Sequence, residues 1–174
     1  MLLSEEHIEQ ITSNCCHLES LKLCGFCGFH RLYLTSPKCK SLELIDHIHP
    51  VYYIKGDCYF EIVAPYVQHL KISGDFNGVE IRLGDLSSLI HADLTYHSSD
   101  YRRLDDVIDK SIVKDHFTRV ACANELIVSS LHIEMISMLI LQEEEVLLPL
   151  LECKRLKIHS WTNKYNLHGI DRLL

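Results

Sequence analysis

The sequence predicts an α/β fold in which short parallel strands recur along a single domain, residues 1–174. Three observations support this prediction. A short pattern of apolar residues occurs six times along the chain. The stretches between its copies show the period of a strand or of a helix. Hydrophobic residues make up 47% of the chain and charged residues 24%, which is typical of a folded domain with a sizeable core.

The repeated pattern is an apolar residue, two variable residues, an apolar residue, one variable residue and a last apolar residue. The clearest copies are LESLKL, CKSLEL, VQHLKI and LIHADL, and the weaker copies are FTRVAC and CKRLKI. Their middle apolar residues stand at positions 21, 42, 70, 92, 120 and 156. Most of the steps between them fall within about 20 to 29 residues, the period of leucine-rich repeats.

The spacing inside each copy has a physical meaning. Its last two apolar residues are two positions apart, so both point to one face of a strand. One copy cannot bury its apolar residues alone, whereas stacked copies build a continuous core and a parallel sheet. The sequence therefore predicts a leucine-rich-repeat solenoid of about six repeats. This would be a curved horseshoe arc with the parallel sheet on its concave side and short strands and helices on its convex side. An ordinary α/β domain with accidental spacing is the alternative.

The segments between the copies form the convex side in this prediction. FHRLYL at 29–34, CYFEIV at 58–63 and GVEIRL at 78–83 alternate apolar and polar residues. This alternation predicts short extended segments.

A first helix is predicted to begin after Ser4, because a serine there can accept hydrogen bonds from free backbone N–H groups at the helix start. Glu5 and Glu6 suit the positive end of the helix dipole, and Ile8 and Ile11 are expected to turn inward.

A second helix is predicted over residues 103–114, following the turn at Ser98-Ser99-Asp100. Its apolar stripe consists of Leu104, Val107, Ile108 and Ile112. Residues 124–141 are apolar at both the helical and the strand period, which leaves helix and strand open.

The charge and the first residues limit the classes of function. The formal net charge is -7 with the histidines neutral, which disfavours general attraction to nucleic acid or to anionic lipid. No apolar run has the length of a membrane span. The start, MLLSEEHIEQ, carries acids where a signal peptide needs a basic start. The sequence thus predicts an intracellular protein of the cytoplasm or nucleus, with reduced thiols.

The variable positions beside the apolar ones face the concave surface in the predicted fold, so they are the candidate binding residues. They are Ser20, Lys22, Ser41, Glu43, His69, Lys71, His91, Asp93, Arg119, Arg155 and Lys157.

The charges of these residues favour two interpretations. Lys22, Glu43, Lys71 and Asp93 alternate in sign, and parallel strands stand about 4.8 Å apart, so neighbours can pair laterally. A solvated ladder that balances charge explains this alternation better than target contact does. Positions 69, 91, 119 and 155 are His or Arg, so an acidic target could dock there.

Metal and catalytic sites have little support in the sequence. Cys24 and Cys27 form a C-x-x-C, but a structural zinc site needs four ligands and the second pair is missing. The motifs of serine hydrolases, phosphate-binding loops and zinc proteases are absent from the sequence. We therefore predict a protein that is not an enzyme and has no metal or cofactor.

Five segments also carry a resemblance to a known family: ITSNCCHLESLKLCGF (11–26), LYLTSPKCKSLEL (32–44), EIVAPYVQHLKISGDF (61–76), LGDLSSLIHADLTY (83–96) and LLPLLECKRLKIHS (147–160). They resemble the repeat region of plant F-box/leucine-rich-repeat proteins. By that resemblance the chain is expected to be the substrate-binding part of a subunit of an SCF-type ubiquitin ligase, in which the F-box docks on the adaptor and the repeats hold the target protein.

The resemblance also bears on the two ends. No F-box precedes the first repeat in this sequence, and WTNKYNLHGIDRLL is similar to a linker before a further strand. We expect a domain truncated at both ends, which binds the SCF adaptor only if the full-length parent has an F-box. The alternative is a truncated fragment that acts only as an interaction or structural scaffold. In either case, uncapped ends predict self-association.

Overall fold

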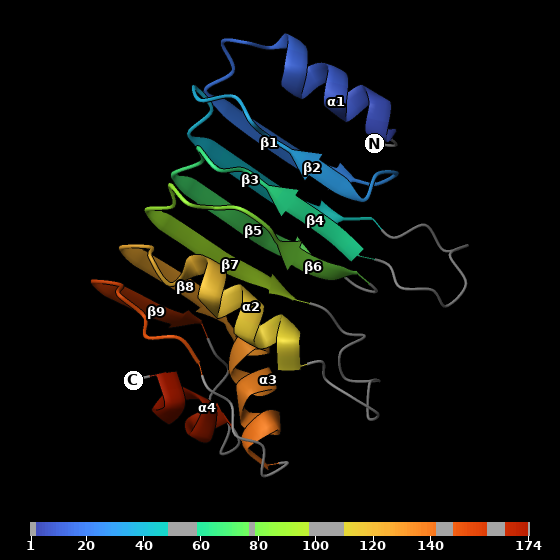
Figure 1. The fold of residues 1–174 in the computed structure, drawn as a ribbon. Helices are drawn as coiled ribbons and strands as arrows, with labels where there is room; N and C mark the ends of the chain where they lie inside the picture. The colour runs from blue at the N-terminus through green and yellow to red at the C-terminus, as the bar shows by residue number, and fades with distance from the viewer. Residues whose placement is uncertain are drawn as a thin grey trace.

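The computed structural model describes residues 3–48, 59–76, 79–97, 110–141, 148–159 and 166–173. It has an α/β architecture, as the sequence predicts, and its strands form two parallel sheets (Figure 1). The helices and strands along the chain are α1 (Glu5–Asn14), β1 (Ser20–Phe26), β2 (Arg31–Tyr33), β3 (Ser41–His47), β4 (Tyr59–Val63), β5 (His69–Asp75), β6 (Glu80–Leu83), β7 (His91–His97), α2 (Lys110–Val120), β8 (Glu125–Ser129), α3 (Ser130–Leu141), β9 (Arg155–His159) and α4 (Asn166–Leu173).

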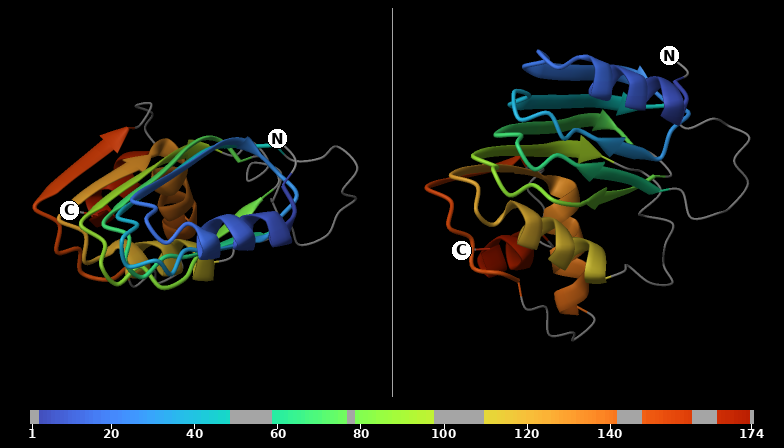
Figure 2. Two further views of the ribbon diagram at one scale, coloured as in Figure 1. Left: turned by 90° about the horizontal axis from the view of Figure 1, so that it is seen from above. Right: turned by 45° about the horizontal axis from the view of Figure 1, so that its top comes forward.

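The chain alternates between two layers. The larger sheet has six strands in the order β1-β3-β5-β7-β8-β9, and the smaller has three in the order β2-β4-β6. Strands β1 to β7 therefore go to the two sheets in turn, and all pairings are parallel. Seen from above, the six-stranded sheet lies on one side, and α1 and α2 lie on the other side with the smaller sheet (Figure 2).

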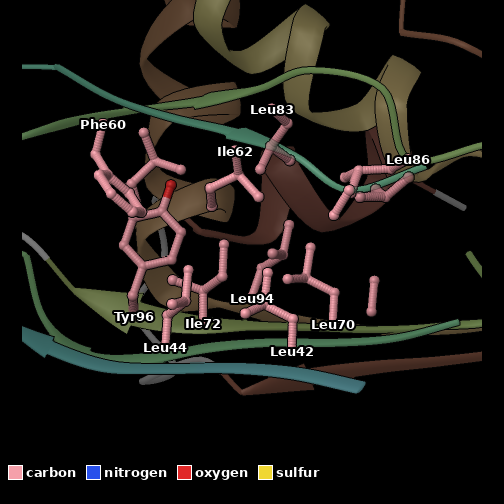
Figure 3. Close-up of a cluster of buried hydrophobic side chains, with 14 of the residues drawn as sticks. Leu42, Leu44, Phe60, Ile62, Leu70, Ile72, Leu83, Leu86, Leu94 and Tyr96 are labelled. Atoms are coloured by element: carbon pink, nitrogen blue, oxygen red, sulfur yellow. The ribbon is translucent and has the colours of Figure 1, made fainter. Parts of the chain in front are cut away.

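The core lies between the two sheets (Figure 3). Leu42, Leu70 and Leu94 of the larger sheet point toward Ile62 and Leu83 of the smaller one, and all five are buried. Because the register pairs Leu42 with Leu70, the apolar residues of successive strands stack directly on one another. The alternation of apolar and polar residues in the sequence is the reason why strands β1 to β7 each have one buried face.

Aromatic rings close one end of this core. Phe26 and Phe60 have ring centroids 5.4 Å apart, and Phe76 and Tyr96 have ring centroids 5.6 Å apart. All four side chains are almost completely buried. Each comes from a different strand or strand end, so the rings tie successive turns of the chain together.

Helices continue the layer of the smaller sheet at both of its edges. Helix α1 packs beside β2, and α2 packs beside β6 (Figure 1). The Nε2 atom of His116 on α2 donates to the carbonyl oxygen of Ile81 at 2.6 Å. This bond occupies an acceptor that a further strand would otherwise use.

The structure corrects the fifth copy of the repeat pattern. FTRVAC at 117–122 was expected to form a strand, but it belongs to the end of α2 and the turn after it. Val113, Phe117 and Val120 are all buried and are spaced as on one face of a helix. The strand that follows β7 is instead β8, in which Leu126 and Val128 point into the core.

The remaining secondary-structure predictions have mixed outcomes. The three segments expected between the copies contain β2, β4 and β6, which confirms those predictions for the described residues. Residues 124–141, left open, hold β8 and then α3. The helix predicted over 103–114 shares only 110–114 with α2, and residues 98–109 lie outside the described part.

The first helix begins as predicted. The Ser4 side chain accepts a hydrogen bond from the His7 backbone N–H, and Ile8 is buried. Ile11 was expected to turn inward, but 37% of its surface is exposed. It lies three residues beyond Ile8, past the edge of the buried face of this short helix.

Two neighbouring strands of the larger sheet carry a backbone feature that the sequence did not indicate. Asp46 at the end of β3 and Gly74 at the end of β5 have φ values of 54° and 87°. The carboxylate of Asp46 accepts a hydrogen bond from the backbone N–H of Asp75 at 2.9 Å. The two strand ends are thereby held together. Within the described residues, no helix is both long and apolar enough to cross a membrane.

Candidate binding surface on the six-stranded sheet

The six-stranded sheet buries one face and presents most of the other to solvent, although Ile127 and Ser129 on that side of β8 are also buried. We call this second face the outer face and define it by two columns of residues that the strand register aligns. The first column is Ser20, Ser41, His69, His91, Glu125 and Arg155. The second column is Lys22, Glu43, Lys71, Asp93, Ile127 and Lys157.

The structure brings together all of the predicted binding residues except Arg119. That residue lies on α2, in the layer of the smaller sheet, and its Nε atom is 3.4 Å from Asp115. The expectation was wrong because it followed from the strand wrongly predicted at 117–122. Glu125 and Ile127 of β8 occupy the corresponding positions of the outer face. The short apolar run Leu126-Ile127-Val128, rich in β-branched residues, was the signal that could have identified this strand.

The predicted lateral pairing of charges is confirmed for two pairs in the second column. Lys22 Nζ is 2.9 Å from Glu43 Oε2, and Lys71 Nζ is 4.0 Å from Asp93 Oδ2. The hydrogen bond from Lys22 lowers the pKa of Glu43, and the same bond raises the pKa of Lys22. Both partners are accessible to water, so these pairs fix side-chain positions more than they stabilise the fold.

A second group of charges surrounds Glu125. Lys157 Nζ is 2.7 Å from Glu125 Oε1, and Arg155 Nη2 is 3.6 Å from Glu125 Oε2. His91 Nδ1 lies 3.5 Å from the same carboxylate. The hydrogen bond from Lys157 is the largest cause that lowers the pKa of Glu125, and the charge of Arg155 adds to it. One carboxylate thus faces two permanent cations, which leaves this end of the outer face positive.

Exposure separates the cations of this group from the acid. The side chains of Arg155 and Lys157 are 73% and 54% exposed, whereas that of Glu125 is only 16% exposed. A molecule that approaches the outer face from solvent therefore meets the two cations before it meets the carboxylate. This arrangement suits contact with carboxylates of a partner.

A cleft of about 650 Å³ lies on the other layer, where β6 meets α2. Its walls include Glu80 and Arg82 from β6 and Lys114 and Asp115 from α2. Arg82 is already bound to Glu80 at 2.6 Å. Because both acids and bases line this cleft, and Arg82 pairs with Glu80 and Arg119 with Asp115, its charges do not favour one kind of ligand.

The cysteines and histidines do not assemble a metal centre in the described part of the chain. No group of three or more His, Cys, Asp or Glu side chains is placed there to hold a metal ion. Of the C-x-x-C pair, Cys24 is exposed on β1 and Cys27 is buried. The two thiols therefore lie in different environments, one in solvent and one in the core.

The buried histidines form a different kind of cluster, between β7, α2 and the β8–α3 junction. His116 and His132 have ring centroids 5.7 Å apart and are almost completely buried. Burial lowers the pKa of His132 to about 3, and burial likewise lowers the pKa of His116. Both rings are therefore neutral near pH 7, and their place inside the core indicates a structural role.

Comparison with models of protein families, with curated proteins and with solved structures finds no match to this chain.

Proposed function

We propose that this chain is a leucine-rich-repeat solenoid that works as a non-catalytic protein-recognition scaffold. The outer face of the six-stranded sheet would be its concave, target-binding side. The observation that carries this proposal is the alignment of residues into two columns across six parallel strands, with a polar or charged residue at every position except Ile127. A rigid sheet that holds such side chains at regular spacing presents a preorganised surface to a partner.

The charges of the outer face favour an acidic segment of a protein as the target. Arg155 and Lys157 share one carboxylate, and Arg155, at 73% exposure, is the most exposed cation of this face for which an ion pair is found. Lys71 and the ring of His69 lie nearer the centre of the sheet. A target with carboxylates would gain from steering toward this end even though the chain as a whole has a formal charge of -7.

Site-specific photocrosslinking tests the location of the target site. Benzoylphenylalanine placed at His69 is expected to crosslink the target in cells, whereas the same group at exposed Thr118 on α2 is expected not to do so. The crosslinked protein, once identified, is purified and its affinity measured for the wild type and for Arg155→Glu. We expect at least a tenfold loss for the variant. Equal crosslinking from both positions would refute the proposed surface.

The family resemblance extends the proposal to a pathway. We place the chain with the target-holding part of an SCF-type ubiquitin ligase subunit, on the strength of the five sequence segments given above. In such subunits the repeats hold the target and the F-box docks on the adaptor. Purified residues 1–174 are therefore expected not to bind the SCF adaptor in a pull-down. Clear binding by these residues would refute the assignment of the chain to the target-holding part.

A scaffold without a ligase role is the second candidate, and exposed apolar residues near β9 favour it. Leu150 is 86% exposed, and Leu156 and Ile158 of β9 are only partly buried. Such residues can join one molecule to another. Sedimentation at increasing protein concentration tests this candidate. Concentration-dependent dimers would support it, and a monomer at all concentrations would count against it.

A further inference from the structure

We propose that β9 is a docking edge that takes up an extended segment of a partner protein as a further parallel strand. The segment carries an acidic residue between two apolar residues. This inference goes beyond the proposed function because it concerns the edge of the sheet rather than its outer face. It does not depend on which target the outer face binds.

The backbone of β9 has one side that the described residues leave unpaired. Within the described part of the chain, β9 pairs only with β8. The Arg155 N–H donates to the Asn124 carbonyl at 3.1 Å, so Arg155 directs its backbone groups toward β8. Backbone groups alternate in direction along a strand. Those of Leu156 and Ile158 therefore point to the open edge, where an added strand can pair with them.

The apolar face of β9 is also incompletely covered. Leu156 and Ile158 are half-buried, whereas their neighbours in β8, Leu126 and Val128, are fully buried. The other edge of the sheet differs. There, Leu21 of β1 is only 8% exposed, although β1 likewise has a strand on one side only. Incomplete burial is thus a feature of the β9 edge and not of edge strands in general.

The charges next to this edge specify the kind of segment. In the second column, Lys22 pairs with Glu43 of the next strand, and Lys71 pairs with Asp93 of the next strand. Lys157 of β9 holds the same column position, pairs with Glu125 of β8 on its other side and is still 54% exposed. An acidic residue on an added strand would lie beside Lys157 as Glu43 lies beside Lys22. Its two apolar neighbours would then cover Leu156 and Ile158.

A second copy of this chain fits the edge less well. If β1 of another molecule were added in parallel, Lys22 would lie beside Lys157 in the second column. If β9 of another molecule were added in the antiparallel direction, Arg155 and Lys157 of both copies would be brought together. Like charges directly opposite each other on neighbouring strands are destabilising. The observations therefore favour a partner with acidic residues.

A labelled peptide with the sequence Ser41–His47, SLELIDH, is a suitable probe because the chain itself shows how this sequence pairs as a parallel strand. In the proposed register, Leu42 and Leu44 cover Leu156 and Ile158, and Glu43 lies beside Lys157. Fluorescence anisotropy is expected to show saturable binding to full-length protein. The peptide with Glu43→Lys is expected to bind at least tenfold more weakly.

Two N-methylated forms of the peptide make the decisive comparison, since they require no change in the protein. Parallel pairing directs the N–H groups of Glu43 and Ile45 toward β9 and those of Leu42 and Leu44 away from it. Methyl groups on the first pair are expected to abolish binding, whereas methyl groups on the second pair leave it within about threefold. Equal binding by both forms, or no binding by the unmodified peptide, would overturn the proposal.

A charge exchange tests the role of Lys157. The protein with Lys157→Glu is expected to lose affinity for the original peptide and to gain it for the Glu43→Lys peptide, with circular dichroism used to verify its fold. Lys114→Glu at an exposed position of α2 is the matched control and is expected to change neither affinity. If the wild type forms dimers that compete with the peptide, a second copy occupies the edge and the proposal is wrong.

Discussion

Acidification is expected to destabilise this protein through its buried histidines. The Tyr96 hydroxyl donates to His116 Nδ1 at 3.4 Å, and His116 Nε2 donates to the Ile81 carbonyl. The Ser129 hydroxyl donates to the Tyr96 carbonyl at 3.0 Å, so its oxygen accepts from His132 Nδ1–H at 3.3 Å. The remaining nitrogen, His132 Nε2, is buried without a hydrogen-bond partner. Burial has the largest effect on the pKa of His116 and lowers it, although the carboxylates of Asp115 and Glu80 act to raise it.

The size of the effect follows from the pKa of His132, which burial lowers to about 3. The ordinary value in an unfolded chain is about 6.5, so below that pH the unfolded state binds a proton that the folded state does not. Stability is therefore complete above about pH 6.5 and falls by about 1.4 kcal/mol per pH unit down to about pH 3. From pH 7 to pH 5 this histidine alone costs about 2 kcal/mol. The lowered pKa of His116 adds a loss of the same sign.

Urea unfolding followed by circular dichroism at pH 5, 6, 7 and 8 measures this loss. His132→Phe keeps an aromatic ring in place and removes the titrating group, so its stability relative to the wild type should improve by about 2 kcal/mol between pH 7 and pH 5. Ile133→Val on the same helix is the control, since it removes packing and leaves both histidines. It should cost about 1 kcal/mol at every pH. An identical pH dependence for His132→Phe and the wild type would refute the reasoning.

Three further substitutions probe the fold, each by urea unfolding at pH 7. Gly74→Ala should lower the free energy of unfolding by about 2 to 3 kcal/mol, because Gly74 has φ of 87° and an added Cβ would collide with the Asp46 carboxylate. The double variant with Gly74→Ala and Asp46→Gly should recover part of this loss. Leu44→Ala should cost about 2 to 5 kcal/mol in the core, and Leu156→Ala clearly less, because Leu156 is half-buried. Equal losses of stability for Leu44→Ala and Leu156→Ala would contradict the incomplete burial of Leu156 at the β9 edge. Ser4→Ala should cost about 1 kcal/mol by loss of the helix cap, and an unchanged midpoint would show that α1 does not depend on it.

The strands of the larger sheet could be predicted wherever their alternation was undisturbed. Leu42 and Leu44 in β3, and Leu70 and Ile72 in β5, repeat the same spacing and all are buried. The predicted ion pairs of Lys22 with Glu43 and of Lys71 with Asp93 followed directly from the aligned register. A strand period is a local property of the chain, so one short segment contains all the information needed to recognise it.

The segment before β8 could not be assigned in this way. Phe117 and Val120 are three positions apart, which fits both the repeat pattern and one face of a helix. Packing on β6 decides for the helix, where His116 reaches the carbonyl of Ile81, 35 residues away in the sequence. The error wrongly placed Arg119 on the outer face and concealed Glu125, the acid that holds Arg155 and Lys157.

Local patterns in the sequence thus determined the α/β class, the parallel strands and most of the outer-face residues. Tertiary structure alone decided where the smaller sheet ends, which carboxylate the exposed cations share, and that Leu156 at one sheet edge is left half-covered while Leu21 at the other is buried. The physical reason is the range of the interactions. Side-chain alternation is set by neighbouring residues, whereas covering an edge and pairing a charge depend on segments that only folding brings together.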